Sequence, residues 1–209
     1  MMTKLPQMKG FDPISPDIAK RMVELAEIKE GQRILVPPTG TGNLLKAILA
    51  EGTCGYNVEK DFCSKPGKSG RDPKNCCCCD MGTLQAIRSK LDIVAVERSL
   101  ELKGALFDIA PWATIITADF FSCAGDLGKF DRIIMAPPFE TSIEHVRHAL
   151  TFLAPGGRLV ALCANGPQAL FNQADYREPL PADRFEAAGN VNVALITIPY
   201  RGDRNLWRD

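Results

Sequence analysis

Four short segments of this sequence carry residues whose types and spacing suit the binding of one ligand. Each segment directly follows an apolar run that is typical of a strand buried in a parallel sheet. In an open α/β sheet, ligands bind beyond the carboxyl ends of the strands, so we expect the four segments to meet at one site. They are Thr39-Gly40-Thr41-Gly42 after residues 34–36, Glu97 after residues 92–96, Asp119-Phe120 after residues 114–117, and Ala136-Pro137-Pro138-Phe139 after residues 130–135.

The first of these segments suits an anionic group. Gly40 and Gly42 lack a Cβ, so the backbone can approach a ligand closely. A helix is predicted from Asn43, and its positive end would point at the same place. The alternative is the glycine turn of any α/β protein, because the third glycine of the dinucleotide-binding fingerprint is missing.

Helices and strands alternate along the rest of the chain, which predicts an α/β fold with a mainly parallel sheet. The first helix is expected to begin at Pro16, to be capped by Ser15 and to end near Gly31. The remaining elements are predicted as helices over residues 81–91, 100–110 and 142–153, and as strands over residues 158–163 and 192–199. Residues 168–184 show no regular pattern, and the last strand is expected to be antiparallel near the sheet edge.

The composition is that of one globular domain over residues 1–209. The apolar content is 45%, the charged content is 24% and the formal net charge is zero. This balance counts against a free-standing DNA-binding protein, which usually has a basic excess. No apolar run is long enough to span a membrane, and the first residues lack the apolar core of a signal peptide, so a cytoplasmic location is expected.

A cysteine-rich insertion is predicted at residues 54–80, where apolar periodicity stops. Cys76 and Cys79 have the C-x-x-C spacing of a tetrahedral zinc site, which Cys54 and Cys63 would complete. The alternatives are a disordered loop without metal and an iron–sulfur cluster. The lysines of the insertion make it locally basic, which suits contact with a nucleic-acid backbone or simply a solvated loop.

Taken together, the motifs resemble the Rossmann-fold S-adenosylmethionine-dependent methyltransferases, particularly the N6-adenine DNA methyltransferases of bacteria and phages. The resemblance covers nearly the whole chain except residues 54–80. It implies a doubly wound, mainly parallel seven-stranded sheet of the class I methyltransferase type. The segments that carry it are residues 11–16, 37–43, 94–97, 118–120, 130–139, 145–149, 153–159 and 180–185.

The resemblance also assigns roles at the site. Glu97 would accept hydrogen bonds from both ribose hydroxyls of S-adenosylmethionine, Asp119 would accept from its adenine amino group, and Phe120 would pack on the adenine ring. The target amine would lie at Ala136, Pro137, Pro138 and Phe139, with Phe139 stacked on an extruded base. The cofactor contacts implied in this way are Pro37, Thr39, Gly40, Gly42, Asn43, Glu97, Asp119 and Phe120.

Two positions depart from the family pattern. Ala136 stands where the family has an Asn or Asp that accepts a hydrogen bond from the target amine, and Val36 stands where it usually has an acid facing the methionine amine. The implied function is therefore methylation of an amino group, adenine N6 in DNA first, impaired by Val36 and Ala136. The alternatives are methylation of RNA or a protein amide, and a non-catalytic binding or assembly module. The chain shows no separate target-recognition domain, so any specificity for DNA is expected to come from the insertion, from residues 164–185 or from a protein partner.

Overall fold

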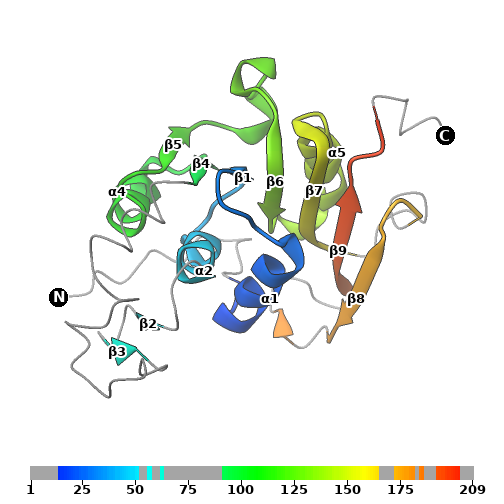
Figure 1. Ribbon diagram of the computed structural model, residues 1–209, viewed down its shortest axis with the longest axis horizontal. Coiled ribbons are helices and arrows are strands. Elements are labelled where there is room, and N and C mark those ends of the chain that lie inside the picture. Colours follow the sequence, from blue (N-terminus) through cyan, green and yellow to red (C-terminus); the bar gives the residue numbers. More distant parts are fainter. Residues whose placement is uncertain are drawn as a thin grey trace.

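A computed structural model describes residues 14–51, 56–57, 62–63, 91–164, 172–181, 184–185 and 192–202 of the 209-residue chain. Its main feature is a seven-stranded sheet with the strand order β5-β4-β1-β6-β7-β9-β8 (Figure 1). The strands are β1 (Arg33–Val36), β4 (Asp92–Glu97), β5 (Thr114–Thr117), β6 (Phe130–Met135), β7 (Leu153–Ala164), β8 (Tyr176–Leu180) and β9 (Val193–Pro199).

The sheet is mainly parallel, as the sequence predicts. β1 pairs in parallel with β4 and β6, β5 adds to β4, and β7 adds to β6. β9 is antiparallel to both of its neighbours, β7 and β8. From β1, successive strands are added first on one side of the sheet and then on the other. This change of side is the switch point where ligands bind in doubly wound sheets. The predicted doubly wound, class I methyltransferase-like sheet is therefore confirmed.

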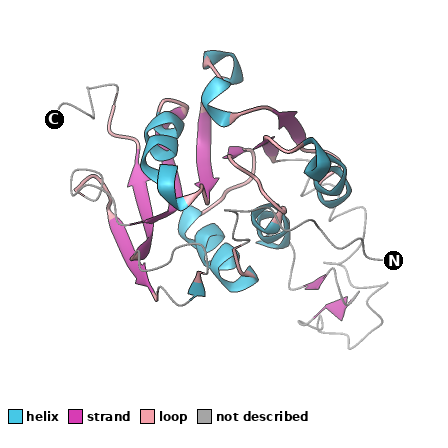
Figure 2. Ribbon diagram, turned by 180° about the vertical axis from the view of Figure 1, so that it is seen from behind, coloured by secondary structure: helices cyan, strands magenta, loops and turns pink. Residues whose placement is uncertain are grey.

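Helices cover both faces of the sheet and define two separate cores. The first core lies under α1 (Pro16–Ala26), α2 (Asn43–Glu51) and α4 (Leu100–Ile109), and the second lies under α5 (Ser142–Leu150). Figure 2, seen from behind, shows α5 over the face opposite α1 and α2. Side chains alternate between the two cores, since Val160 packs in the first while Leu159 and Ala161 pack in the second. Burial on both faces explains the continuous apolar runs of the central strands.

Two arginines hold the carboxyl end of α1 on the sheet. The Arg132 side chain is only 7% exposed, and its Nε donates to the carbonyl of Ala26 at 2.6 Å. Arg158 donates to the carbonyl of Leu25 at 3.2 Å and pairs with Glu27 at 2.9 Å. The helix ends at Ala26 because Glu27 adopts a left-handed conformation with φ 49°. The prediction that this helix continues to near Gly31 was wrong.

The amino end of the same helix begins as predicted. Pro16 is its first residue, and the carbonyl of Ser15 accepts the backbone N–H of Ala19 at 3.0 Å. The side chain of Ser15 makes no capping hydrogen bond to the helix backbone, so the prediction that Ser15 caps this helix was wrong.

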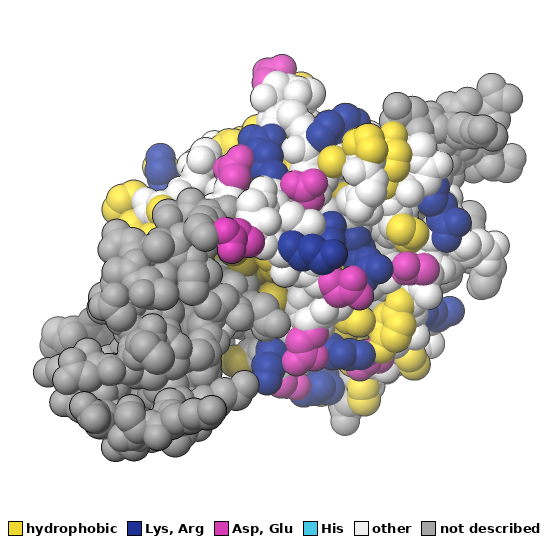
Figure 3. Space-filling view, viewed as in Figure 1, with side chains coloured by type: hydrophobic (Ala, Val, Ile, Leu, Met, Phe, Trp, Pro, Cys, Tyr) yellow, Lys and Arg dark blue, Asp and Glu magenta, His cyan; other side chains and the backbone are white. Residues whose placement is uncertain are grey.

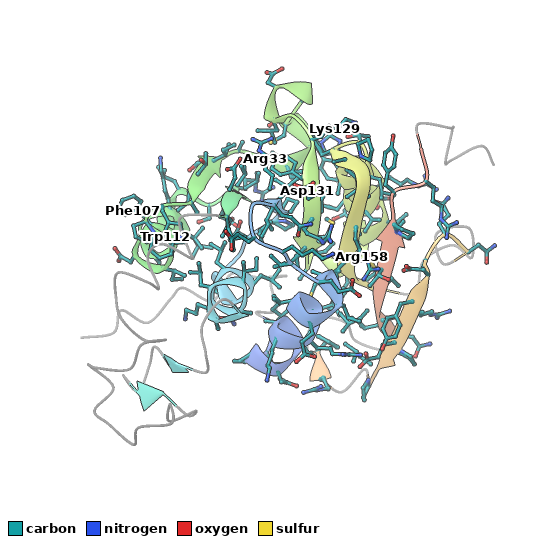
Figure 4. The ribbon with its side chains drawn as sticks, viewed as in Figure 1. Arg33, Phe107, Trp112, Lys129, Asp131 and Arg158 are labelled. Atoms are coloured by element: carbon teal, nitrogen blue, oxygen red, sulfur yellow. The ribbon has the colours of Figure 1, made fainter. Side chains whose placement is uncertain are left out.

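Charged side chains near the amino ends of β1 and β6 form a structural network (Figure 4). The backbone N–H of Arg33 donates to Asp131 at 2.8 Å, and the Arg33 side chain donates to Asp92 at 2.7 Å. The guanidinium of Arg33 also lies 4.3 Å from the centre of the Phe130 ring. These contacts of Arg33 join neighbouring strands at their amino ends. The site residues lie at the opposite, carboxyl ends.

Three predictions about the carboxyl-terminal half need correction. α5 ends at Leu150 rather than Leu153, because Leu153 already pairs with Phe130 and opens β7. The prolyl-glycyl segment after Leu153 lies inside that long strand, with a register shift, rather than before it. β8 lies in a region that shows no pattern in the sequence, since it is mostly exposed and contains Pro179. β8 takes the sheet edge, and β9 beside it is antiparallel and near the edge, as expected.

Most of the cysteine-rich insertion lies outside the described residues, as do residues 81–90 of the predicted helix over 81–91. Two short strands of the insertion are described, β2 (Tyr56–Asn57) and β3 (Phe62–Cys63), and they pair antiparallel. Within the described ranges, no helix has the length and apolar content needed to cross a membrane.

Candidate functional site

The glycine turn is tied to two neighbouring strands through Thr39. The backbone N–H of Thr39 donates to the carbonyl of Val96 at 2.9 Å. Its hydroxyl lies 2.8 Å from the carbonyl of Val36 and 3.1 Å from that of Val96. Thr39 is 5% exposed, so these bonds are shielded from water. The turn is therefore held rigidly at the carboxyl ends of β1 and β4.

Both glycines of the turn are required by their backbone conformation, and Gly42 is also required by a close contact with α4. Both have positive φ, 59° for Gly40 and 85° for Gly42, which a residue with a Cβ adopts only with strain. A Cβ on Gly42 would also lie 2.7 Å from Cδ1 of Ile109 and 3.0 Å from Cδ2 of Leu106. Gly42 thus allows α4 to pack against the start of α2, a constraint that the turn motif alone does not reveal.

Glu97 is the buried acid of the site. It is 6% exposed, and its Oε2 accepts the backbone N–H of Gly40 at 2.7 Å while its Oε1 accepts that of Ser99 at 2.8 Å. A carboxylate oxygen has two lone pairs, so each oxygen keeps one for a ligand. The prediction that Glu97 and the glycine turn come together is confirmed by the Gly40 bond. The arrangement fixes the position of the Glu97 carboxylate at the carboxyl ends of β1 and β4.

Asn43 connects the glycine turn to the segment before α1. Its side-chain amide donates to the carbonyl of Ile14 at 2.8 Å. A small hollow joins these residues to Ala136, with an enclosed volume of about 20 Å³, which is room for one water molecule. Its walls are Ile14, Pro38, Thr39, Thr41, Asn43, Leu44 and Ala136. The first and fourth sequence motifs therefore lie side by side, as predicted.

The fourth motif continues from Ala136 into a single helical turn. Phe139 begins that turn, and its half-buried ring packs edge to face on Phe185 with the ring centres 5.5 Å apart. Ala136 carries no hydrogen-bonding side chain, and Val36 is fully buried in the first core. The two departures noted in the sequence thus both leave the site without a charged or amide side chain.

Asp119 and Phe120 lie where the third motif was expected, at the end of β5. One oxygen of Asp119 accepts the backbone N–H of Phe121 at 2.8 Å and caps the short helix η2 (Phe120–Ser122). The ring of Phe120 is 4% exposed and belongs to the second core, so it has no open face toward a ligand in this structure. The neighbouring ring of Phe121 is 45% exposed.

Two histidines of α5, to which the sequence assigns no role, contact the third motif. Nε2 of His148 donates to the carbonyls of Phe120 and Cys123 at 3.0 and 3.1 Å. Nδ1 of His145 donates to the carbonyl of Thr141 at 2.8 Å, and burial lowers the pKa of His145 below 6.5. The two histidines are three residues apart, about one helical turn, and this spacing is the sequence feature that predicts both on the same face of α5.

The candidate zinc ligands cannot be brought together from the described residues. Cys54, Cys76 and Cys79 lie outside them, and Cys63 is described only as part of β3. Among the residues that the structure does describe, no three His, Cys, Asp or Glu side chains form a metal-binding group. Burial raises the pKa of the Cys163 thiol to about 12 and also raises that of Cys123, as for ordinary structural thiols. Zinc binding therefore stays a prediction.

The strand order, the glycine turn and the buried acid of β4 define the class I methyltransferase fold. No protein-family model matches the sequence, and the search of curated proteins gave no match. Solved structures of the same fold do match, at low sequence identity.

Three of these solved structures illustrate the likeness. A type I restriction-modification methyltransferase subunit from Streptococcus thermophilus has a TM-score of 0.62 and 14% identity, with 93% of this chain and 46% of that chain covered. TrmN from Thermus thermophilus has a TM-score of 0.56 and 18% identity, with 89% and 49% covered. An RNA methyltransferase from Salinibacter ruber, solved with S-adenosylhomocysteine, has a TM-score of 0.55 and 14% identity, with 94% and 100% covered. The chain thus spans about half the length of the first two and the full length of the third.

Proposed function

We propose that this chain binds S-adenosylmethionine and methylates an amino group of a nucleic-acid base, with adenine N6 in DNA as the first substrate to test. The observation that carries the proposal is the pairing of buried Glu97 with the backbone N–H of Gly40 at the carboxyl ends of β1 and β4. A carboxylate fixed by two backbone donors, with two lone pairs left over, suits the ribose hydroxyls of this cofactor.

When bound, S-adenosylmethionine supplies an electrophilic methyl group on a sulfonium sulfur. The residues of the chain would hold the reactants in line, which is the main source of rate in such transfers. The carbonyl of Pro137 would accept a hydrogen bond from the target amine, and Phe139, with its ring plane set by Phe185, would support a flat base. Thr39 and Ala136 line one small hollow, so a cofactor held at the glycine turn and a base held at the fourth motif would lie side by side.

Support for a nucleic-acid substrate comes from the fourth motif and from the solved structures of similar fold. The surface gives less support, because Figure 3 shows basic and acidic side chains interspersed on the viewed face. With a formal net charge of zero, affinity for DNA or RNA would depend on the cysteine-rich insertion or on a protein partner.

A second function, a binding module without methyltransferase activity, is favoured by a specific observation. Ala136 offers no acceptor, and Val36 lies in the core, so neither helps to position an amine or the methionine part of the cofactor. This alternative keeps cofactor binding and removes transfer.

Calorimetric titration with S-adenosylmethionine and S-adenosylhomocysteine tests the cofactor claim. The variant Glu97→Gln removes one acceptor oxygen and the charge, and we expect it to weaken binding on the order of 10- to 100-fold. Glu101 is an acid in the first turn of α4. The variant Glu101→Gln is the matched control and should bind as the wild type does. Absence of binding by the wild type at millimolar concentration would refute the proposal.

Transfer of tritiated methyl groups to DNA, RNA and protein separates the two functions. Binding without transfer to any of these would favour the module over the enzyme.

A further inference from the structure

The third motif is a short segment closed by its own hydrogen bonds and packed into the second core through Phe120. Residues 119–123 contain one turn of 3-10 helix, closed by the backbone N–H groups of Ser122 and Cys123, which donate to Asp119 and Phe120 at 3.0 Å each. A single 3-10 turn is too short to be stable by itself, so its conformation depends on contacts from elsewhere.

His148 supplies such a contact from α5, on the second face of the sheet. Its Nε2 lies 3.0 Å from the carbonyl of Phe120 and 3.1 Å from that of Cys123. Because a carbonyl only accepts hydrogen bonds, Nε2 must carry the proton. One N–H group therefore bridges the beginning and the end of the turn.

The imidazole ring of His148 also packs in the second core. Its centre lies 4.8 Å from that of the Phe120 ring and 5.2 Å from that of Phe152, in edge-to-face contacts. Those contacts fix the direction of the Nε2–H bond. His148 thus has two separable functions in the structure, a ring that packs and a donor that holds the turn.

We propose that His148 is a positioning residue, which holds Asp119 and the backbone of residues 119–123 in the conformation that receives the adenine ring of the cofactor. This inference rests on the proposed cofactor and adds a residue that lies outside the four strand-end motifs. A segment ordered in advance loses less conformational entropy when the ligand binds, so affinity should fall when the donor is removed.

Two substitutions separate the donor from the ring. His148→Phe keeps an aromatic ring and loses the donor, whereas His148→Gln keeps an amide N–H of similar reach and loses the ring. We expect His148→Phe to weaken S-adenosylhomocysteine binding by about 3- to 10-fold and His148→Gln by no more than about 2-fold. His145→Phe is the matched control, since it keeps an aromatic ring beside Phe121 and removes only a hydrogen bond to Thr141, which lies outside residues 119–123.

Hydrogen exchange of the peptide covering residues 119–123, without ligand, tests the anchoring independently of the cofactor. Exchange should be faster in His148→Phe than in His148→Gln and in His145→Phe. The proposal is overturned if His148→Gln binds more weakly than His148→Phe, since packing alone would then explain the residue, or if exchange rises while affinity is unchanged. If the wild type binds no cofactor, the proposed function fails and the cofactor role of His148 fails with it, while the exchange result still reports on the anchoring.

Discussion

Replacing Gly42 by alanine should destabilise the protein more than any ordinary glycine substitution on its surface. The backbone at Gly42 has φ +85°, which costs a residue with a Cβ about 1–2 kcal/mol. The added Cβ would also lie 2.7 Å from Cδ1 of Ile109 and 3.0 Å from Cδ2 of Leu106, and overpacking of this kind costs about 1–3 kcal/mol. We therefore expect Gly42→Ala to lower the free energy of unfolding by about 2–4 kcal/mol.

The chain offers a matched control and a way to isolate the steric part. Gly31 has a similar φ of +81° with no atom within 4 Å of a built Cβ, so Gly31→Ala should cost only the backbone part, about 1–2 kcal/mol. Ile109→Val deletes the Cδ1 atom that the new Cβ would meet. In the double variant, part of the Gly42→Ala loss should return, with a coupling free energy of about 1 kcal/mol.

Urea denaturation followed by circular dichroism measures the wild type and the four variants. Equal losses for Gly42→Ala and Gly31→Ala, or additive effects in the double variant, would show that contact with α4 is not what requires glycine at position 42. The double variant should also bind S-adenosylhomocysteine better than Gly42→Ala, because the turn is part of the proposed cofactor site.

The remaining predictions concern stability, pH, catalysis and metal. Arg132→Met should lower the free energy of unfolding by about 2–4 kcal/mol in the same denaturation assay, because the last carbonyls of α1 lose a buried charged donor. Burial lowers the pKa of His145 below 6.5, so its contribution to stability is constant above pH 6.5 and falls as the unfolded chain takes up the proton below it. His145→Phe should therefore flatten the difference in stability between pH 7 and pH 5, and an unchanged difference would contradict the burial argument. Ala136→Asn should raise tritium-methyl transfer to adenine-containing DNA by roughly 10- to 100-fold by restoring an acceptor, whereas brisk transfer by the alanine form and no gain would refute the role of that position. Elemental analysis should find about one zinc per chain, held by the cysteine-rich insertion, and metal-free protein would remove that prediction.

Much of the fold follows from local patterns in the sequence. Short apolar runs such as residues 34–36 and 133–135 are typical of strands buried on both faces, and their alternation with helices indicates parallel pairing. Parallel strands end at the same edge, so Glu97 had to lie near the glycine turn once both were assigned to strand ends. The Glu97–Gly40 hydrogen bond is the direct result of that reasoning.

Other features were decided by contacts between residues far apart in the chain. Leu153 is apolar enough to end a helix or to begin a strand, and its pairing with Phe130 made it a strand residue. β8 is exposed and contains Pro179, so its sequence resembles a loop, and only pairing with β9 makes it a strand.

The features of the site can be separated in the same way, into those predicted from the sequence and those decided by packing. Its residue types at the strand ends are determined by the sequence, because strand direction alone brings them to one edge of the sheet. The burial of Phe120, the contact between Gly42 and Ile109, and the bond from His148 depend on how α4 and α5 pack, and packing joins surfaces that no local pattern specifies. For this protein, the sequence by itself determined which residues lie at the strand ends, and the tertiary structure decided which of them are buried and which hold the others in place.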